Sequence, residues 1–210
     1  MNKKFILMLF LCCLSTQIFS QFRSGLILGG GINHPWNGKL NTNLPMVQEL
    51  LEWNTNCEFF TYSGYNASLG YKFRLEPKPN SFFYDIDLFL GFKSYGDAYY
   101  YDYYDSSGSY RMRSHDERKS DFYTSLNLSA NYRINKRFYA GAGLEPTVYN
   151  MNHEGFKRSF DMPVTSKIGV DLKYVELALS YKIGFLNTLD SRYHKSLNLN
   201  DLQLQLFIPF

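Results

Sequence analysis

The sequence has 210 residues, of which 45% are hydrophobic and 20% are charged, and its mean hydropathy is −0.32. This length fits one domain, and this polarity excludes a bundle of membrane helices. Aromatic residues make up 18% of the chain, which is more apolar surface than a disordered chain carries, and the formal net charge of +3 is too small to favour nucleic-acid binding.

Residues 1–20 have the order of a secretory signal peptide. Lys3 and Lys4 form a short basic start, an apolar run follows over 5–14, and a polar stretch leads to an expected cut before Gln21. Cys12 and Cys13 lie in the apolar run, so we expect them to leave with the leader and expect no lipoprotein processing. The mature chain 21–210 then keeps only Cys57, to which the sequence assigns no role and which has no partner for an internal disulfide.

From residue 21 onward, apolar and polar residues alternate with a period of two. In 122–134, for example, Leu126, Leu128 and Ala130 share an apolar face, while Asn127 and Ser129 belong to the polar face. The same alternation predicts eight strands, centred on 26–32 and extending over 65–75, 82–92, 122–134, 138–148, 164–174, 175–185 and 202–210.

The connections between these strands alternate in length. Short turns are predicted at 77–81, 135–136 and 173–175, and long excursions at 33–60, 95–121, 150–162 and 186–201. Short turns at one end and long loops at the other are typical of outer-membrane barrels. The sequence therefore predicts an all-β fold, an eight-stranded antiparallel up-and-down transmembrane β-barrel over 21–210, with short periplasmic turns and long extracellular loops. A soluble barrel or sandwich also alternates, with its apolar face inward.

Two features favour the membrane barrel. Aromatic residues gather at both ends of the apolar face, as in the girdles of membrane barrels: Phe73, Phe82, Tyr84, Tyr132, Phe138 and Tyr174 beside the short turns, and Tyr65, Phe92, Phe122 and Phe185 beside the long loops. The polar face carries nearly balanced charges that are expected to form ion pairs and plug a narrow lumen: Lys72, Arg74, Asp85, Asp87, Lys93, Arg133, Glu145, Lys167, Asp171, Glu176 and Lys182, together with Glu76 and Lys173.

The loops hold the candidate interaction residues. Residues 97–110 read DAYYYDYYDSSGSY, a mixture of aromatic and small polar residues like that of antibody paratopes, which makes Tyr99, Tyr100, Tyr101, Tyr103 and Tyr104 candidates. A compatible interpretation is a protruding hairpin, closed at 106–109, whose tyrosines pack on one another.

A helix is predicted in the first long loop. Met46, Leu50 and Trp53 have helical spacing over 45–53, after Asn43 as a candidate cap. We expect this segment to cap the barrel mouth or lie on the outer leaflet, with Trp53 as a further interaction candidate.

Motifs for catalysis, cofactors and metals are sparse. The sequence contains no Walker loop, HExxH, CxxC or GxSxG motif, and Gly29, Gly30 and Gly31 fall within a predicted strand rather than before a helix. The four histidines, His34, His115, His153 and His194, lack ligand spacing. We therefore expect no cofactor and no bound metal.

The last strand resembles the closing strand of bacterial outer-membrane proteins. It carries Leu202, Leu204, Leu206, Ile208 and a terminal Phe210, with Pro209 as a departure suited only to a strand end. Together with the leader and the phrase LKYVEL at 172–177, the mature chain resembles the small outer-membrane β-barrel proteins abundant in Bacteroidota, which are similar in architecture to OmpA, OmpX and PorT-like barrels. The resemblance implies an outer-membrane location, contact with outer-membrane lipids and lipopolysaccharide, and recognition of the Phe210 strand by the barrel-assembly machinery. It implies no shared catalytic site.

Three function classes follow. We favour a non-enzymatic structural or interaction barrel, either an adhesin or a subunit of an envelope or secretion complex with a protein partner at its extracellular loops. A narrow channel is one alternative, although the inward charges leave little open path.

The other alternative is a lipid acyl hydrolase. His194 and Ser196 resemble the His-x-Ser pair of barrel lipid A deacylases, and Asp190 or Asp201 could orient the imidazole. The change of parity at Leu197 and Leu199 instead favours a location for the pair in a loop near the rim.

Overall fold

The computed structural model describes residues 21–36, 38–53, 57–77, 81–104, 110–150, 159–186, 189, 193–195 and 197–210. Its elements are β1 (Gln21–Trp36), β2 (Lys39–Leu40), α2 (Pro45–Trp53), β3 (Glu58–Tyr62), β4 (Gly64–Glu76), β5 (Phe82–Tyr104), β6 (Tyr110–Arg133), β7 (Phe138–Leu144), β8 (Thr147–Tyr149), β9 (Phe160–Asp161), β10 (Val164–Asp171), β11 (Glu176–Ile183), β12 (His194–Lys195) and β13 (Asn198–Pro209).

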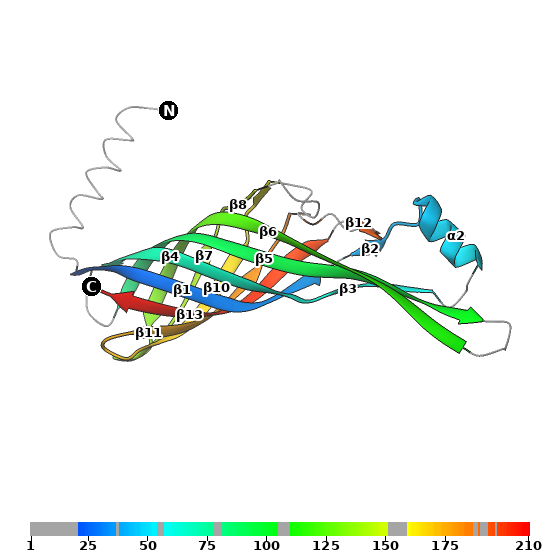
Figure 1. Ribbon diagram of the computed structural model, residues 1–210. Coiled ribbons are helices and arrows are strands. Elements are labelled where there is room, and N and C mark those ends of the chain that lie inside the picture. Colours follow the sequence, from blue (N-terminus) through cyan, green and yellow to red (C-terminus); the bar gives the residue numbers. More distant parts are fainter. Residues whose placement is uncertain are drawn as a thin grey trace, which may run out of the picture.

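A closed antiparallel ring of eight strands forms the body of the molecule (Figure 1). The ring runs in chain order through β1, β4, β5, β6, β7, β10, β11 and β13, and β13 pairs back onto β1 from Gly25↔Pro209 to Trp36↔Asn198. This arrangement confirms the predicted up-and-down barrel, and it leaves no open sheet edge within the ring.

The register of the strands sets the tilt of the barrel. Stepping across paired residues from Phe22 leads once around the ring and returns to β1 at Ile32, ten residues further along, through Leu75, Tyr84, Ala130, Ala142, Ser166, Tyr181 and Leu202. A stagger of this size in eight strands tilts them by roughly 40° and encloses an interior that side chains can fill.

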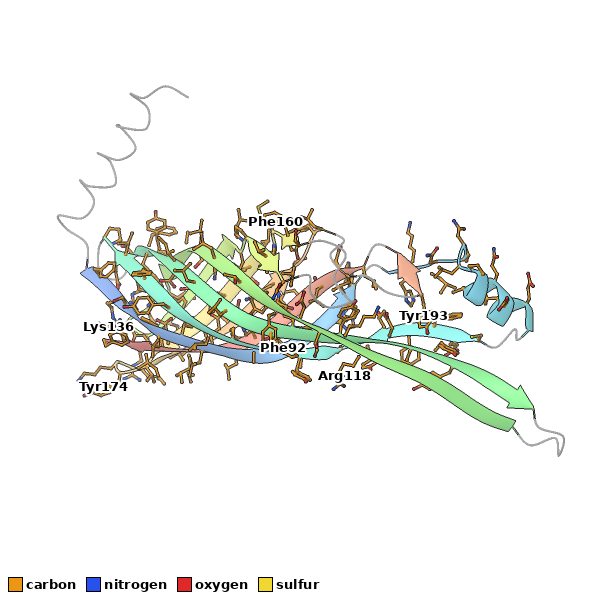
Figure 2. The ribbon with its side chains drawn as sticks, turned by 45° about the horizontal axis from the view of Figure 1, so that its top comes forward. Phe92, Arg118, Lys136, Phe160, Tyr174 and Tyr193 are labelled. Carbon is orange, nitrogen blue, oxygen red and sulfur yellow. The ribbon has the colours of Figure 1, made fainter. Side chains whose placement is uncertain are left out.

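The predicted short turns lie at one end of the barrel, here called the short-turn end; the opposite end is the long-loop end. Residues 77–81 join β4 to β5, residues 134–137 join β6 to β7, and residues 172–175 join β10 to β11. Figure 2 shows Lys136 and Tyr174 at the short-turn end. The assignment of Lys173 to the lumen was wrong, because Lys173 lies in the last of these turns, exposed and with a φ of 78°.

The barrel wall is apolar on its outer face and polar inside. Leu128 is 45% exposed, Ile168 59% and Leu204 57%, whereas Lys72 and Arg74 are fully buried. Aromatic pairs lie near both ends, such as Phe82 with Tyr132 at the short-turn end and Phe92 with Phe122 at the long-loop end. This distribution is the reverse of that in a soluble barrel, whose apolar side chains fill the interior.

Two prolines interrupt the wall without breaking its register. Pro146 separates β7 from β8 and Pro163 separates β9 from β10, yet the Glu145 amide still donates to the Pro163 carbonyl (2.9 Å). Pro163 has no N–H, so it cannot donate a hydrogen bond to the Glu145 carbonyl in exchange. The Thr147 hydroxyl donates to that carbonyl instead, at 2.9 Å.

At the long-loop end, β5 and β6 continue beyond the ring as a paired hairpin as far as Tyr104↔Tyr110 (Figure 1). This extension agrees with the protruding hairpin predicted from the tyrosine-rich segment, although residues 105–109 lie outside the described residues. β3, which was not predicted, pairs with β5 from Glu58↔Tyr100 to Tyr62↔Gly96 and adds a third strand. Ser63 is the extra residue of a bulge between β3 and β4, since the register against β5 shifts by one residue there.

The predicted helix is α2, with the predicted bounds. The Leu44 carbonyl accepts the first helical bonds, from Val47 and Gln48 at 3.0 Å, so the helix begins one residue later than a cap at Asn43 requires. No helix in the described part of the chain has the length and apolar character needed to cross a membrane.

Candidate functional site

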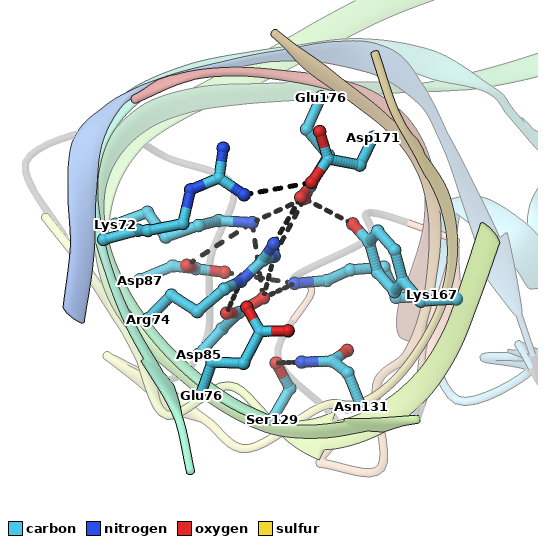
Figure 3. Close-up of polar contacts among 12 residues, drawn as sticks. Lys72, Arg74, Glu76, Asp85, Asp87, Ser129, Asn131, Lys167, Asp171 and Glu176 are labelled. Atoms are coloured by element: carbon cyan, nitrogen blue, oxygen red, sulfur yellow. Dashed lines mark hydrogen bonds and ion pairs between the residues drawn. The ribbon is translucent and has the colours of Figure 1, made fainter. Parts of the chain in front are cut away.

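An arginine lies at the centre of the lumen, in its short-turn half (Figure 3). Arg74 of β4 donates to Asp85 of β5 from Nε at 2.7 Å and from Nη2 at 2.9 Å, and to Glu176 of β11 from Nη2 at 2.9 Å. The guanidinium therefore joins strands on opposite sides of the ring with charge-assisted hydrogen bonds. Tyr139 of β7 also donates to Glu176, at 2.6 Å.

Two lysines complete this central network, defined as Lys72, Arg74, Asp85, Asp87, Lys167 and Glu176. Lys72 Nζ lies 3.3 Å from Glu176, 3.4 Å from Asp85 and 3.9 Å from Asp87. Lys167 Nζ lies 3.2 Å from Asp87 and 3.6 Å from Asp85. Three cations thus share three carboxylates, and this mutual pairing compensates for taking six charges out of water.

A second set of ion pairs lies at the short-turn mouth. Arg133 Nε is 2.7 Å from Glu76, Arg133 Nη1 is 3.7 Å from Asp171, and Arg23 Nη1 is 3.0 Å from Asp171. Arg23 was not predicted as a lumen residue. The sequence could have identified Arg23, because it has the same odd parity as Ile27, which is fully buried on the inner face of β1.

The long-loop half of the lumen holds separate pairs. Lys93 is 2.7 Å from Asp201, and Lys182 is 2.7 Å from Glu145. Asp201 was missed because it was placed at the end of a loop, whereas β13 begins at Asn198. The odd parity that Asp201 shares with Gln203 and Gln205 would have identified it.

Of the thirteen predicted lumen charges, all but Lys173 make an ion pair in the structure. These pairs occur at three levels along the barrel axis, and aromatic rings fill space between them: Arg74 lies over Phe83 at 4.2 Å, Lys93 over Tyr123 at 4.6 Å and Lys182 over Phe89 at 5.3 Å. The charged side chains of the lumen therefore join strands to one another through ion pairs. No group of His, Cys, Asp and Glu among the described residues is arranged to hold a metal.

Aromatic packing fixes the base of the protruding hairpin. Tyr99 lies 5.9 Å from Phe59 and 5.4 Å from Tyr193, which is fully buried, and Tyr100 stacks on Phe60 at 4.9 Å. Tyr99 and Tyr100 thus pack within the protein, but on Phe59, Phe60 and Tyr193, whereas the second interpretation of this segment predicts that its tyrosines pack on one another. Tyr101, Tyr103 and Tyr104 belong to β5, but their side chains, like that of Trp53, lie outside the described residues.

A small substructure lies beside this base; it consists of β2, α2 and β12 with Tyr193, and it is here called the cap. β12 pairs with β2 through His194↔Leu40, and the Asn41 amide donates to the Tyr193 carbonyl at 2.7 Å. Val47 of α2 is fully buried. Figure 2 shows Tyr193 in this cap, at the long-loop end.

His194 lies in β12, and its half-buried ring belongs to the cap. Burial lowers the pKa of His194, while Asp97 and a hydrogen bond to the backbone of Phe59 oppose this effect. Asp201, one of the residues considered for orienting the imidazole, is paired with Lys93. Ser196 and Asp190 lie outside the described residues, so the expected absence of lipid acyl hydrolysis stays a prediction.

The lowered pKa of His194 predicts that the cap loosens in acid. Between the folded pKa and the unfolded value of about 6.5, the unfolded state binds more protons, so stability falls as the pH falls through this window. Amide exchange at β2 and β12, corrected for intrinsic rates, is expected to be faster at about pH 5 than at about pH 7.5. His194→Gln should remove this difference, and an unchanged difference in that variant would show that another group is responsible.

No family model matches the sequence, and no curated protein sequence matches it. Among solved structures, the chain is similar to the outer membrane protein OprG from Pseudomonas aeruginosa, at 10% identity and a TM-score of 0.42, covering 90% of this chain and 91% of that one. It is also similar to Neisserial surface protein A (11% identity, TM-score 0.33, 90% and 99% covered) and to the NanC porin (7% identity, TM-score 0.33, 88% and 98% covered). The fold described above is established by the strand register of this chain rather than by these similarities.

Proposed function

We propose that this chain is an integral outer-membrane protein whose barrel anchors a protruding sheet outside the cell, and that it acts by binding a partner through that sheet. The observation that carries the proposal is the continuity of β5 and β6, which pair without a break from the barrel wall at Phe92↔Phe122 to Tyr104↔Tyr110. The binding surface is therefore built on rigid strands rather than on loops alone. An adhesin or a subunit of an envelope or secretion complex fits this design.

The membrane part of the proposal is supported by the outer surface. Large apolar side chains lie exposed around the whole ring, among them Leu28, Leu69, Leu90, Leu144 and Leu179. In water this surface would far exceed the apolar patches that soluble monomers expose. In a bilayer it matches the apolar band between two aromatic girdles.

A role as anchor rather than channel is supported by the lumen. Ion pairs cross the ring at three levels, and the charges of the central network are almost completely withdrawn from solvent, with Lys72, Arg74, Asp85 and Lys167 at no more than 2% exposure. In planar bilayers, the purified barrel is expected to show no large steady conductance. Reproducible open steps at neutral pH would favour the narrow channel instead.

The membrane-facing wall predicts a depth-dependent cost for charge. Leu128→Arg places a guanidinium near the middle of the apolar band, so we expect it to lower the free energy of unfolding by about 2 to 4 kcal/mol in refolding titrations with lipid vesicles. Ile134→Arg adds the same charge at the short-turn rim and should cost about 0 to 1 kcal/mol. Equal costs at the two positions would argue that this face does not contact lipid.

The test of the function separates anchoring from binding. The mature chain should fractionate with the outer membrane and migrate faster unheated than boiled in SDS gels, since a closed barrel resists detergent. In a second protein, an Asn-Gly turn joins Tyr100 directly to Ser114, which pair in register, and so removes the hairpin tip. Both proteins carry a photo-reactive residue at position 58, which is exposed and pairs with Tyr100 at the base of the hairpin. The shortened variant should keep the gel shift but lose the partner that this residue captures in the full chain on intact cells. Recovery in the soluble periplasm, or no specific capture by the full chain, would overturn the proposal.

A further inference from the structure

The register of the protruding hairpin brings tyrosines opposite basic residues. Tyr99 pairs with His115, Tyr101 with Arg113, and Tyr103 with Arg111. Because side chains alternate along a strand, these positions share one face of the hairpin. The contact of Tyr99 with Tyr193 identifies this face as the one that meets the cap at its base.

Charge is distributed unequally between the two faces. From Tyr99 and His115 outward, the face that includes Tyr101, Tyr103, Arg111 and Arg113 has no carboxylate at any register position. We call these four residues the tyrosine–arginine face. The acidic register position of the same segment, Asp102, falls on the opposite parity and therefore on the other face, and the first acidic pair with the parity of the tyrosine–arginine face, Asp97↔Glu117, lies on the barrel side of Tyr99 and His115.

We propose that the tyrosine–arginine face binds an acidic segment of a partner protein, one that presents Asp or Glu side chains. This inference rests on the proposed function and names the chemistry of its partner. Arginine forks bind carboxylates in a bidentate manner. This face has two arginines at successive register positions, and each is paired with a tyrosine rather than with an acidic residue. Complementary charge then requires an acidic partner.

The residue types favour a protein over a polysaccharide. Tyrosine and arginine are enriched at the energetic centres of protein interfaces, where tyrosine supplies rigid contact area at low entropic cost. A purely electrostatic surface for an anionic polymer would not need the tyrosines. Tyr101 and Tyr103 are therefore expected to contribute to binding together with the two arginines.

The test uses the folded full-length barrel and poly-L-glutamate as the acidic polypeptide probe. Arg111→Gln/Arg113→Gln should weaken binding by about tenfold or more, since two charge-assisted contacts are lost. Arg118→Gln/Arg137→Gln is the matched control, because it removes the same charge from the other face of the hairpin and from a short turn. It should change binding by less than about twofold, and equal losses in the two variants would overturn the proposal.

Two further arms complete the experiment. Tyr101→Ser/Tyr103→Ser should also weaken binding of poly-L-glutamate, and an unchanged affinity would contradict the role of the tyrosines. Dextran sulfate tests the polysaccharide alternative: if it binds through Arg111 and Arg113 while poly-L-glutamate does not, the acidic-protein proposal is wrong. Capture on intact cells of a partner that does not need these arginines would overturn this inference and leave the proposed function standing, whereas no capture at all would overturn the proposed function.

Discussion

Asp85→Asn is expected to lower the free energy of unfolding by about 3 to 5 kcal/mol, because it removes one partner from a buried ion-pair network. Asp85 lies within 3.6 Å of three cations: Arg74 at 2.7 Å, Lys72 at 3.4 Å and Lys167 at 3.6 Å. Asparagine keeps the size of the side chain and removes the charge. The three cations would then share only Asp87 and Glu176, so one buried positive charge would be left uncompensated.

Urea titration of the barrel refolded into lipid vesicles measures this cost, and the temperature at which the heat-shifted gel band disappears provides a second reading. Glu58→Gln is the control, since it neutralises an exposed carboxylate on β3 and should change the free energy by less than about 0.5 kcal/mol. A loss of less than about 1 kcal/mol for Asp85→Asn would show that water enters the lumen and screens the network.

Gly31→Ala is expected to destabilise the closure of the barrel by about 3 kcal/mol. A Cβ at Gly31 would overlap the carbonyl oxygen of Leu202, which belongs to the backbone of β13 across the seam where the ring closes. A backbone oxygen cannot rotate away as a side chain can, so the two strands would have to separate locally. The pairing of Gly31 with Gln203 on β13 would then weaken.

Gly30→Ala provides the matched control one residue away. A Cβ at Gly30 would point to open space, with the nearest atom, the Asn66 carbonyl oxygen, 4.0 Å away. This variant should differ from the native chain by less than about 0.5 kcal/mol in the same urea titration. If both alanine variants fold with equal stability, the seam is more adaptable than its register implies.

The sequence was sufficient for the barrel because one rule, the alternation of faces, operates along every strand of the ring. The same rule identified the lumen charges from Lys72 to Lys182, since a charged side chain on a strand buried in a bilayer must face inward. Alternation cannot show how far a strand continues beyond the membrane. The paired segments 95–104 and 110–121 were therefore counted as a long excursion, although the tyrosine-rich segment suggested a hairpin.

The pairings within the lumen could not be predicted. That Arg74 joins Asp85 to Glu176 depends on the stagger of the ring, which no single strand encodes. Strand ends were the other source of error. Asp201 was assigned to a loop because β13 begins earlier than predicted, at Asn198, and Lys173 was assigned to the lumen because parity has no meaning where a turn reverses the chain. β3 was missed because its pairing partner is the extension of β5 rather than a neighbour in sequence.

The continuity of β5 and β6 from barrel to tip has a mechanical consequence. A force that pulls on the hairpin acts along the axes of these two strands. It is therefore carried by the hydrogen bonds that join β5 to β4 and β6 to β7. These hydrogen bonds run across the strands, and a force in this direction strains many of them together instead of peeling them one at a time. The barrel therefore resists extraction of the hairpin by shear.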